Sequence, residues 1–200
     1  CAYFYDTTKP CNKRAPGSGC GALEGLNRNS AIFGASHACI ATHPSDMAVA
    51  MAALGATVEV LSPSGQARAF PVIELHRLPG ETPEVETHLI PGELITAVVL
   101  PPAPAGGQVY RKVRDRASYA GGLASVAVAG GAIAFGAVAH KPWRAVEAEA
   151  ALVAGASPTE AIAAELAQAS ANARNGFKID LIGRLGPVAI DEARDNGRGA

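Results

Sequence analysis

The spacing of apolar residues after position 43 predicts a short helix. The helix is expected to begin at Pro44, with Thr42 or Ser45 as the capping side chain, and to end before Gly55. Residues that recur with helical spacing form its expected apolar face: Met47, Ala50, Met51 and Leu54.

Three strands are predicted after this helix. Alternating residues mark the first strand at 57–61, and the turn at 62–65 returns the chain as a hairpin partner over 66–72. The third strand lies within 89–100. Its sequence ELITAVVL is nearly all apolar, which predicts burial on both faces.

The segment 101–107 contains three prolines and two glycines and is the best internal boundary. Beyond it the pattern predicts strands at 108–115, 123–129 and 132–139, helices at 142–153 and 157–173, a weak helix near 187–193 and a disordered tail at 195–200. The order of helices and strands predicts an α+β fold.

All four cysteines stand in the first 46 residues: Cys1, Cys11, Cys20 and Cys39. Turn-forming residues separate the first three, so this segment forms neither a core nor a helix. A loop of this length inside a compact domain needs a tether. Two disulfides, a zinc ion, an iron–sulfur cluster or unlinked thiols are all compatible with the spacing.

The 200 residues are 48% hydrophobic and 18% charged, with a formal net charge of −1. This composition is typical of globular proteins, and the near-zero charge argues against nucleic acid or an anionic membrane as the main partner. No apolar run approaches the length of a membrane span. Because the chain opens on Cys1 inside a polar loop, we expect that an N-terminal part is missing. Abundant Ala and Gly suggest a GC-rich bacterial source.

No nucleophile–base pattern or phosphate-binding glycine motif stands out. The histidines lack metal-ligand spacing and are predicted to be surface or turn residues: His37, His43, His76, His88 and His140. Asp46 suits the first turn of a helix, where a negative charge is favourable. The charged sequence KVRDR at 112–116 fits either a solvated strand edge or a site for an anion or an electron-rich ring.

Several segments in order resemble the FAD-binding medium subunit of the molybdenum hydroxylases, the xanthine dehydrogenase and aldehyde oxidoreductase family. They are CAYFYDTTKPCNKRAPGSGC, CIATHPSDMAVAMAALGATVEV, LHRLPGETP, PGELITAVVLP, YRKVRDRASY and VAHKPWRA. The cysteine-rich part resembles the branch whose flavin subunit carries an additional 4Fe-4S cluster, as in bacterial aldehyde oxidoreductases of the periplasmic type.

The resemblance implies the C-terminal part of a PCMH-type FAD-binding domain with its cysteine insertion over 1–102, and a CO-dehydrogenase-flavoprotein-like C-terminal α/β domain over 107–194. The family's glycine-rich pyrophosphate loop would precede Cys1. The chain departs from the family between 126 and 140, where several residues are expected to be deleted, and this departure leaves the strand pairing there open.

The same resemblance assigns roles to individual residues. Asp46, Ile95 and Lys112 match contacts to FAD in the family. The implied ligands of the 4Fe-4S cluster are Cys1, Cys11, Cys20 and Cys39.

The implied function is that of an oxidoreductase subunit in a molybdenum-containing aldehyde or xanthine dehydrogenase-type complex. Electrons would pass from a large molybdenum-cofactor subunit through a small 2Fe-2S subunit to FAD and an external acceptor. Neither nucleic acid nor a membrane is an expected partner, and the compartment stays open between cytoplasm and periplasm. The alternatives are a truncated, flavin-free structural remnant and a disulfide-stapled binding domain.

Overall fold

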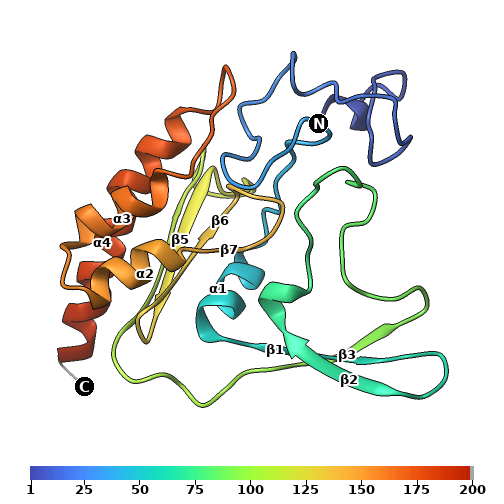
Figure 1. Ribbon diagram of the computed structural model, residues 1–200. Coiled ribbons are helices and arrows are strands. Elements are labelled where there is room, and N and C mark those ends of the chain that lie inside the picture. Colours follow the sequence, from blue (N-terminus) through green and yellow to red (C-terminus); the bar gives the residue numbers. More distant parts are fainter. Residues whose placement is uncertain (199–200) are drawn as a thin grey trace.

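The computed structural model describes residues 1–198 and builds them from two antiparallel sheets and four α-helices (Figure 1). In chain order the elements are the 3-10 turn η1 (Ala2–Phe4), α1 (Asp46–Leu54), β1 (Thr57–Leu61), β2 (Ala67–Pro71), the 3-10 turn η2 (Val72–Glu74), β3 (Leu94–Val99), β4 (Gln108–Val113), β5 (Ala124–Ala129), β6 (Ala132–Gly136), β7 (Trp143–Arg144), α2 (Val146–Val153), α3 (Pro158–Leu166) and α4 (Phe177–Arg198). The predicted α+β fold is confirmed. Among residues 1–198, no helix has the length and apolar character needed to cross a bilayer.

The strands of one sheet precede the segment 101–107 in the sequence, and the strands of the other sheet follow it. Strands β2, β1 and β3 form the first sheet in that order, and β4, β5, β6 and β7 form the second. Gly130 and Gly131 connect β5 and β6 with positive φ angles of 56° and 87°, which suit a two-residue hairpin turn. The stretch after Val126, where a deletion was expected from the resemblance, therefore folds as a tight hairpin with regular pairing.

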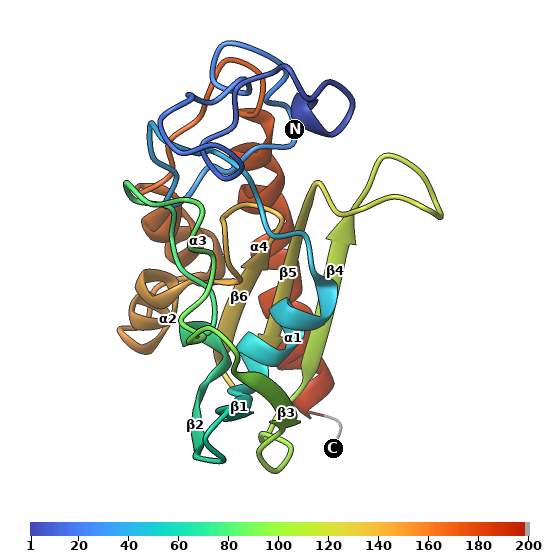
Figure 2. The ribbon, with the colours of Figure 1, turned by 90° about the vertical axis from the view of Figure 1, so that its right-hand side faces the viewer.

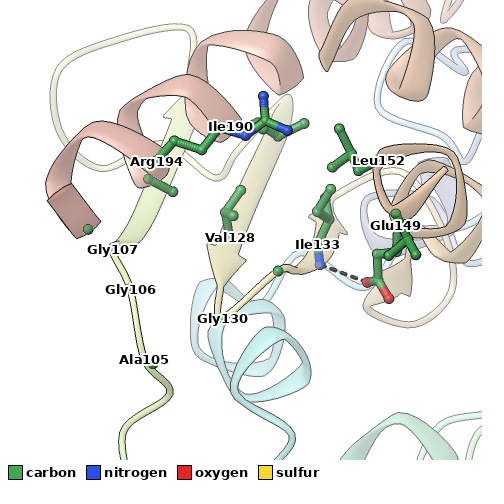
Figure 3. A pocket seen from close by; sticks show the side chains of 14 residues that line it. Ala105, Gly106, Gly107, Val128, Gly130, Ile133, Glu149, Leu152, Ile190 and Arg194 are labelled. Atoms are coloured by element: carbon green, nitrogen blue, oxygen red, sulfur yellow. Dashed lines mark hydrogen bonds between the residues drawn. The ribbon is translucent and has the colours of Figure 1, made fainter. Parts of the chain in front are cut away.

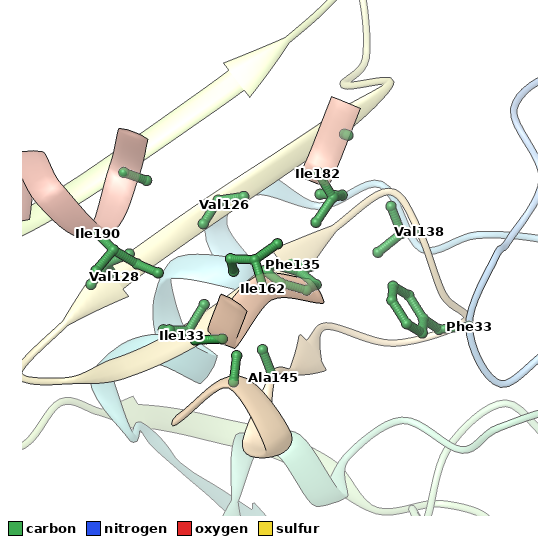
Figure 4. Close-up of a cluster of buried hydrophobic side chains, with 14 of the residues drawn as sticks. Phe33, Val126, Val128, Ile133, Phe135, Val138, Ala145, Ile162, Ile182 and Ile190 are labelled. Atoms are coloured by element: carbon green, nitrogen blue, oxygen red, sulfur yellow. The ribbon is translucent and has the colours of Figure 1, made fainter. Parts of the chain in front are cut away.

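The four-stranded sheet is covered on both faces (Figure 2). Helix α4 packs on β4 and β5 from one side, and α1 packs on β5 and β6 from the other. Every residue of β5 is buried as a result. The side toward α4 holds the main hydrophobic cluster (Figure 4), whose larger members include Phe33, Val126, Ile133, Phe135, Ile162, Ile182 and Ile190.

The opposite face of β5 belongs to a second cluster. Ala127 and Ala129 pack there with Val49 of α1 and with Val58 and Val60 of β1. Residues from both sides of the 101–107 connector thus share one core. The division into domains at 1–102 and 107–194 stays a prediction.

Helix α1 ends before Gly55 as predicted, but it begins at Asp46 rather than at Pro44 and buries a different face. Ser45 caps it, its Oγ accepting a hydrogen bond from the backbone N–H of Ala48 at 3.2 Å, and Pro44 lies outside the helix. The residues that it buries are Ala48, Val49, Ala52 and Ala53, while Met47 is 67% exposed. These small side chains let α1 approach the sheet closely. The prediction chose the face with the larger apolar residues and was therefore wrong about which face is buried.

The expected double-sided burial of the third strand is wrong. In β3, Leu94 is 66% exposed and Val99 is 45% exposed. Strand β3 lies at the edge of the three-stranded sheet. Its apolar run therefore reflects strand propensity rather than a position inside the core.

The helices after β6 differ from the prediction in their limits. Trp143 and Arg144 pair with β6 as β7, so no helix begins at Pro142. Helix α2 begins at Val146, where the buried carboxylate of Glu165 accepts hydrogen bonds from the N–H groups of Glu147 and Ala148 at 2.9 and 3.2 Å. The capping box at Ser157 is confirmed, but α3 ends at Leu166.

Helix α4 is far longer than the weak helix expected near 187–193. It covers 22 residues and continues through Pro187. Burial of Ile182, Ala189 and Ile190 against the sheet outweighs the low propensity of its glycines and proline. Residues 195–198 belong to this helix, so the predicted tail is wrong there, and 199–200 lie outside the described residues.

The start of α4 also anchors the long N-terminal loop. The Lys178 Nζ donates hydrogen bonds to the carbonyls of Asn29 and Ala137 at 3.0 and 2.7 Å, and Asn175 Nδ2 donates to the carbonyl of Ala31 at 2.9 Å. Burial, together with the charge of Arg28, lowers the pKa of Lys178 to about 8. A buried cation thus joins the loop to the end of β6.

We expect Gly136→Ala to lower the free energy of unfolding by about 1–3 kcal/mol, because the core has no room for a methyl group there. A Cβ at position 136 would lie 2.5 Å from Val49 Cγ2 and 2.3 Å from Ser125 Oγ. Urea denaturation measures the change. Gly121→Ala is the matched control, since a Cβ at Gly121 meets nothing within 4 Å. Equal stability of the two variants would contradict this account of how α1 packs on β6.

Because the pKa of Lys178 is lowered, we expect the free energy of unfolding to change with pH in the alkaline range. Its folded pKa of about 8 lies below the value near 10.4 of an unfolded lysine, so the unfolded chain holds more protons between these pH values. The free energy of unfolding should therefore rise with pH across this interval, by about 3 kcal/mol relative to Lys178→Met. Denaturation at several pH values tests this, with the exposed Lys9→Met as control. A constant difference between wild type and Lys178→Met would refute it.

Candidate functional site

The cysteine loop contains four free thiols, so the disulfide alternative is not supported. Cys11 and Cys20 face each other across an isolated antiparallel bridge. Between them, Asn12 links the separate arms of the loop. Its Oδ1 accepts a hydrogen bond from Gly19 N, and its Nδ2 donates one to the carbonyl of Ala38, both at 2.8 Å.

Asn12 therefore holds the segment of Cys39 against the segments of Cys11 and Cys20. Cys39 is buried, and burial raises the pKa of its thiol, with Cys20 and Cys11 near enough to act in the same direction. Cys1 is exposed beside η1. Three of the four predicted ligands thus share one neighbourhood, and the fourth lies at the surface.

No group of three His, Cys, Asp or Glu side chains within residues 1–198 is arranged to hold one metal ion. The zinc alternative therefore has no support. The arrangement of these side chains in residues 1–198 does not show a 4Fe-4S site either, and that assignment stays a prediction. In donor type, four unpaired thiols in a loop tied together by a side-chain amide fit such a cluster.

Three histidines gather beside this loop, contrary to the prediction that all five are surface or turn residues. His43, His76 and His140 line a cavity of about 40 Å³. The rings of His43 and His76 lie 4.2 Å apart between centroids. Burial is the largest cause that lowers the pKa of His76 and of His140 to about 4, so both rings are neutral at physiological pH. The histidines come from distant segments, and no sequence spacing could have grouped them.

The second candidate site joins Asp46 to Lys112. The resemblance implied a contact to FAD for each of them, which stays a prediction. Asp46 is the first residue of α1, and its carboxylate binds Lys112 Nζ through one oxygen. The other oxygen accepts a hydrogen bond from the Tyr110 hydroxyl at 2.7 Å. Tyr110 and Lys112 are two apart on β4, so their side chains emerge on the same face of the sheet as α1.

The electrostatics of this site favour an ionised carboxylate. Burial would raise the pKa of Asp46, but hydrogen bonds from Lys112 and Tyr110 and the charge of Arg114 outweigh it and hold this pKa below its usual range. Burial and the neighbouring carboxylate raise the pKa of Tyr110. The group of Asp46, Tyr110 and Lys112 is open to solvent, since the Asp46 side chain is 47% exposed and the Lys112 side chain is 19% exposed. It can therefore contact a ligand that approaches from outside.

Ile95 does not join this group. It lies on β3 in the other sheet, opposite Val60 of β1, and is 41% exposed. Sequence reasoning missed Tyr110, although its place two residues before Lys112 on a predicted strand was a usable signal.

Two other charged residues in and beside KVRDR, Asp115 and Arg111, make surface ion pairs. Arg111 pairs with Glu192 of α4 at 2.7 Å, and Asp115 pairs with Arg28 at 2.8 Å. The solvated-edge interpretation thus describes Asp115, and the specific-site interpretation fits Lys112.

A larger cavity of about 610 Å³ lies elsewhere, between the β5–β6 hairpin, α2 and α4 (Figure 3). Val128, Ile133, Leu152 and Ile190 supply apolar walls, and Arg194 is a charged side chain at its side. Glu149 also lines it, but its carboxylate is bound by the Ile133 N–H at 2.7 Å and by Arg144. None of the site residues that the sequence predicted lines this cavity.

A family model and a related protein that resemble this chain both concern FAD binding. Residues 14–103 match the family described as FAD binding domain in molybdopterin dehydrogenase. Over 97% of its length the chain is 53% identical to the aldehyde oxidoreductase FAD-binding subunit of Escherichia coli, and it spans 62% of that subunit.

Solved structures share the fold. Reconstituted CO dehydrogenase from Oligotropha carboxidovorans has a chain 26% identical, with a TM-score of 0.62 over 76% of this chain and 57% of that one. A chain of quinoline 2-oxidoreductase from Pseudomonas putida is 22% identical, with a TM-score of 0.61 over 78% of this chain and 58% of that one. At 22% identity, the similarity to the quinoline 2-oxidoreductase chain shows a shared fold and nothing more.

We expect Asp46→Asn to lower the free energy of unfolding at neutral pH by about 1 kcal/mol, because an exposed carboxylate loses two charge-assisted contacts. The folded pKa of Asp46 is depressed, so the wild-type advantage exists above the unfolded pKa and fades as pH falls through the folded one. Urea denaturation at neutral and acidic pH measures it. Asp180→Asn, which also removes an exposed acid from a first helical turn, is the control for the helix dipole. Equal losses in both variants would exclude a special role of Lys112 and Tyr110.

Proposed function

We propose that this chain is the FAD-binding electron-transfer subunit of a molybdenum-containing aldehyde oxidoreductase-type complex. Its similarity in sequence and in fold to FAD-binding subunits of molybdopterin dehydrogenases supports this proposal. The observation that carries the proposal is the 53% identity to a subunit of that name, sustained over 97% of this chain. The chain spans 62% of that relative, so the activity of the whole subunit is part of the proposal.

Asp46 and Lys112 are the proposed polar contacts to FAD, and Ile95 is the proposed apolar contact from β3. FAD supplies the redox chemistry when it is bound, and the protein contributes binding, orientation and charge. The Asp46 carboxylate can accept hydrogen bonds from a ligand hydroxyl or N–H. The Lys112 ammonium, held in place by Asp46, can stabilise negative charge on a flavin ring.

Cys1, Cys11, Cys20 and Cys39 are the proposed ligands of a 4Fe-4S cluster. Four free thiols, three of them gathered by Asn12, support this ligand set. Cys1 stands on the exposed turn η1 and would have to come inward to complete the set. Burial of Cys39 and hydrogen bonds around its sulfur would then help to set the reduction potential.

The proposed partners are a large molybdenum-cofactor subunit and a small 2Fe-2S subunit. In such a complex the aldehyde reacts on the large subunit and does not touch this chain.

Flavin titration of the full chain tests the FAD proposal. We expect Asp46→Asn and Lys112→Met each to weaken FAD binding by about tenfold to a hundredfold, because a hydrogen bond to a charged group contributes about 1.5–3 kcal/mol. Arg111→Met is the matched control: it removes a cation from the same strand, but one that pairs with Glu192 of α4. Flavin fluorescence quenching gives the dissociation constants.

Wild type without saturable flavin binding would favour the flavin-free structural alternative. Equal weakening by Arg111→Met would show that net charge, rather than the Asp46–Lys112 pair, governs affinity. For the cluster, anaerobically isolated wild type should contain about four iron and four acid-labile sulfide per chain. Preparations free of both would refute the 4Fe-4S assignment while leaving the FAD result intact.

A further inference from the structure

His140 makes a buried contact with the sulfur of Cys39. Its Nε2 lies 3.2 Å from Cys39 Sγ, and both side chains are buried, at 8% and 7% exposure. The contact joins residues that are 101 positions apart in the chain. Backbone hydrogen bonds fix both sides, since His43 N donates to the carbonyl of Ala139 at 2.8 Å and Ala31 N donates to the carbonyl of Ile40 at 2.8 Å. The geometry is therefore held by the fold rather than by a mobile surface side chain.

The other ring nitrogen of His140 belongs to an unusual group. Among the residues that the structure describes, the buried side-chain nitrogens or oxygens without a hydrogen-bond partner are the Nδ1 atoms of His43, His76 and His140. All three rings line the same cavity of about 40 Å³. Buried polar atoms without partners are costly, and three at one place call for a common explanation.

That cavity, at about 40 Å³, has room and polar lining for at least one water molecule. A water needs about 10–15 Å³ of accessible space and two to four polar partners. It can donate two hydrogen bonds and accept two, which suffices for three imidazole nitrogens. The Lys13–Glu86 pair, at 2.7 Å, also lines the cavity and supplies further polar atoms.

We propose that His43, His76 and His140 bind a shared buried water, and that this water fixes His140 as an N–H donor to the sulfur of Cys39. A neutral imidazole has one N–H and one lone pair. If the water donates to Nδ1, the proton resides on Nε2, which points at the sulfur. His140 is then a positioning residue that orients Cys39 and stabilises negative charge on its thiolate.

This inference rests on the proposed 4Fe-4S cluster and deepens it. Hydrogen bonds to ligand sulfurs stabilise the more negative, reduced state of a cluster, and they are among the factors that set its potential. Loss of the His140 donor should therefore make the cluster harder to reduce.

The test compares His140→Leu, His140→Gln and His88→Leu in the anaerobically isolated full chain. His140→Leu removes the donor, His140→Gln keeps an N–H on a side chain, and His88→Leu removes an exposed histidine. We expect His140→Leu to lower the one-electron equilibrium constant for reduction about tenfold, a shift of about 59 mV. His140→Gln should recover at least half of that shift, and His88→Leu should match wild type.

A second readout separates a hydrogen bond from mere packing. Electron–nuclear double resonance on dithionite-reduced, ¹⁵N-histidine-labelled protein should detect a histidine nitrogen and an exchangeable proton near the cluster. The histidine nitrogen signal, and the part of the exchangeable-proton signal that the His140 N–H contributes, should vanish in His140→Leu and persist in His88→Leu.

The outcomes distinguish two failures. Wild type without iron and sulfide refutes the proposed cluster, and this inference falls with it. Wild type with a cluster whose potential and resonance signals are unchanged in His140→Leu refutes the role of His140 alone. Loss of the cluster in His140→Leu but not in His140→Gln would support the role in orienting Cys39.

Discussion

The burial of β5 on both faces is the constraint on which the rest of this structure depends. Each residue of this strand contacts either the α4 side or the α1 side, so neither helix can shift without exposing a core. Because α1 is fixed in this way, its first residue, Asp46, stands at a defined place over β4. The pairing of β4 with β5 in turn sets where Tyr110 and Lys112 emerge. The polar group at Asp46 is thus a consequence of how the core is packed.

The cysteine loop is attached to the same core through Ile32 and Phe33, which belong to the main hydrophobic cluster, and through a few polar side chains. Residues 1–21 contribute no buried hydrophobic side chain, so hydrogen bonds hold that part of the loop. Lys178 and Asn175 attach its second half to α4, and Asn12 attaches its first half to the segment of Cys39. A buried lysine has a cost, which the lowered pKa of Lys178 reflects. Two carbonyl contacts that join distant segments offset part of that cost.

Local signals in the sequence predicted local structure well. The limits of β1, the end of α1 before Gly55, the capping box at Ser157 and the Gly130–Gly131 hairpin each follow from a few adjacent residues. Properties that depend on distant neighbours were missed. The apolar run of β3 does not reveal that it is an edge strand, and the glycines and Pro187 of α4 conceal a helix that the sheet stabilises. The histidine group depends on three segments that meet only in the folded chain. The contact between Asp46 and Lys112 joins residues 66 positions apart, and no local pattern in the sequence predicted it.

The segment from Cys39 to Asp46 connects the two proposed cofactor sites. It begins at a buried sulfur, passes His43 at the histidine cavity and ends at the first residue of α1. A hydrogen bond from His43 to Ala139 ties it to the stretch that carries His140. A displacement of α1 would therefore be transmitted to Cys39 through seven covalently linked residues. A proposed cluster ligand and a proposed flavin contact on one short segment, which is buried at Cys39 and exposed at Asp46, keep a constant separation. Constant separation is what electron transfer between two centres requires of a protein, so the proposed function is consistent with the way this segment is held.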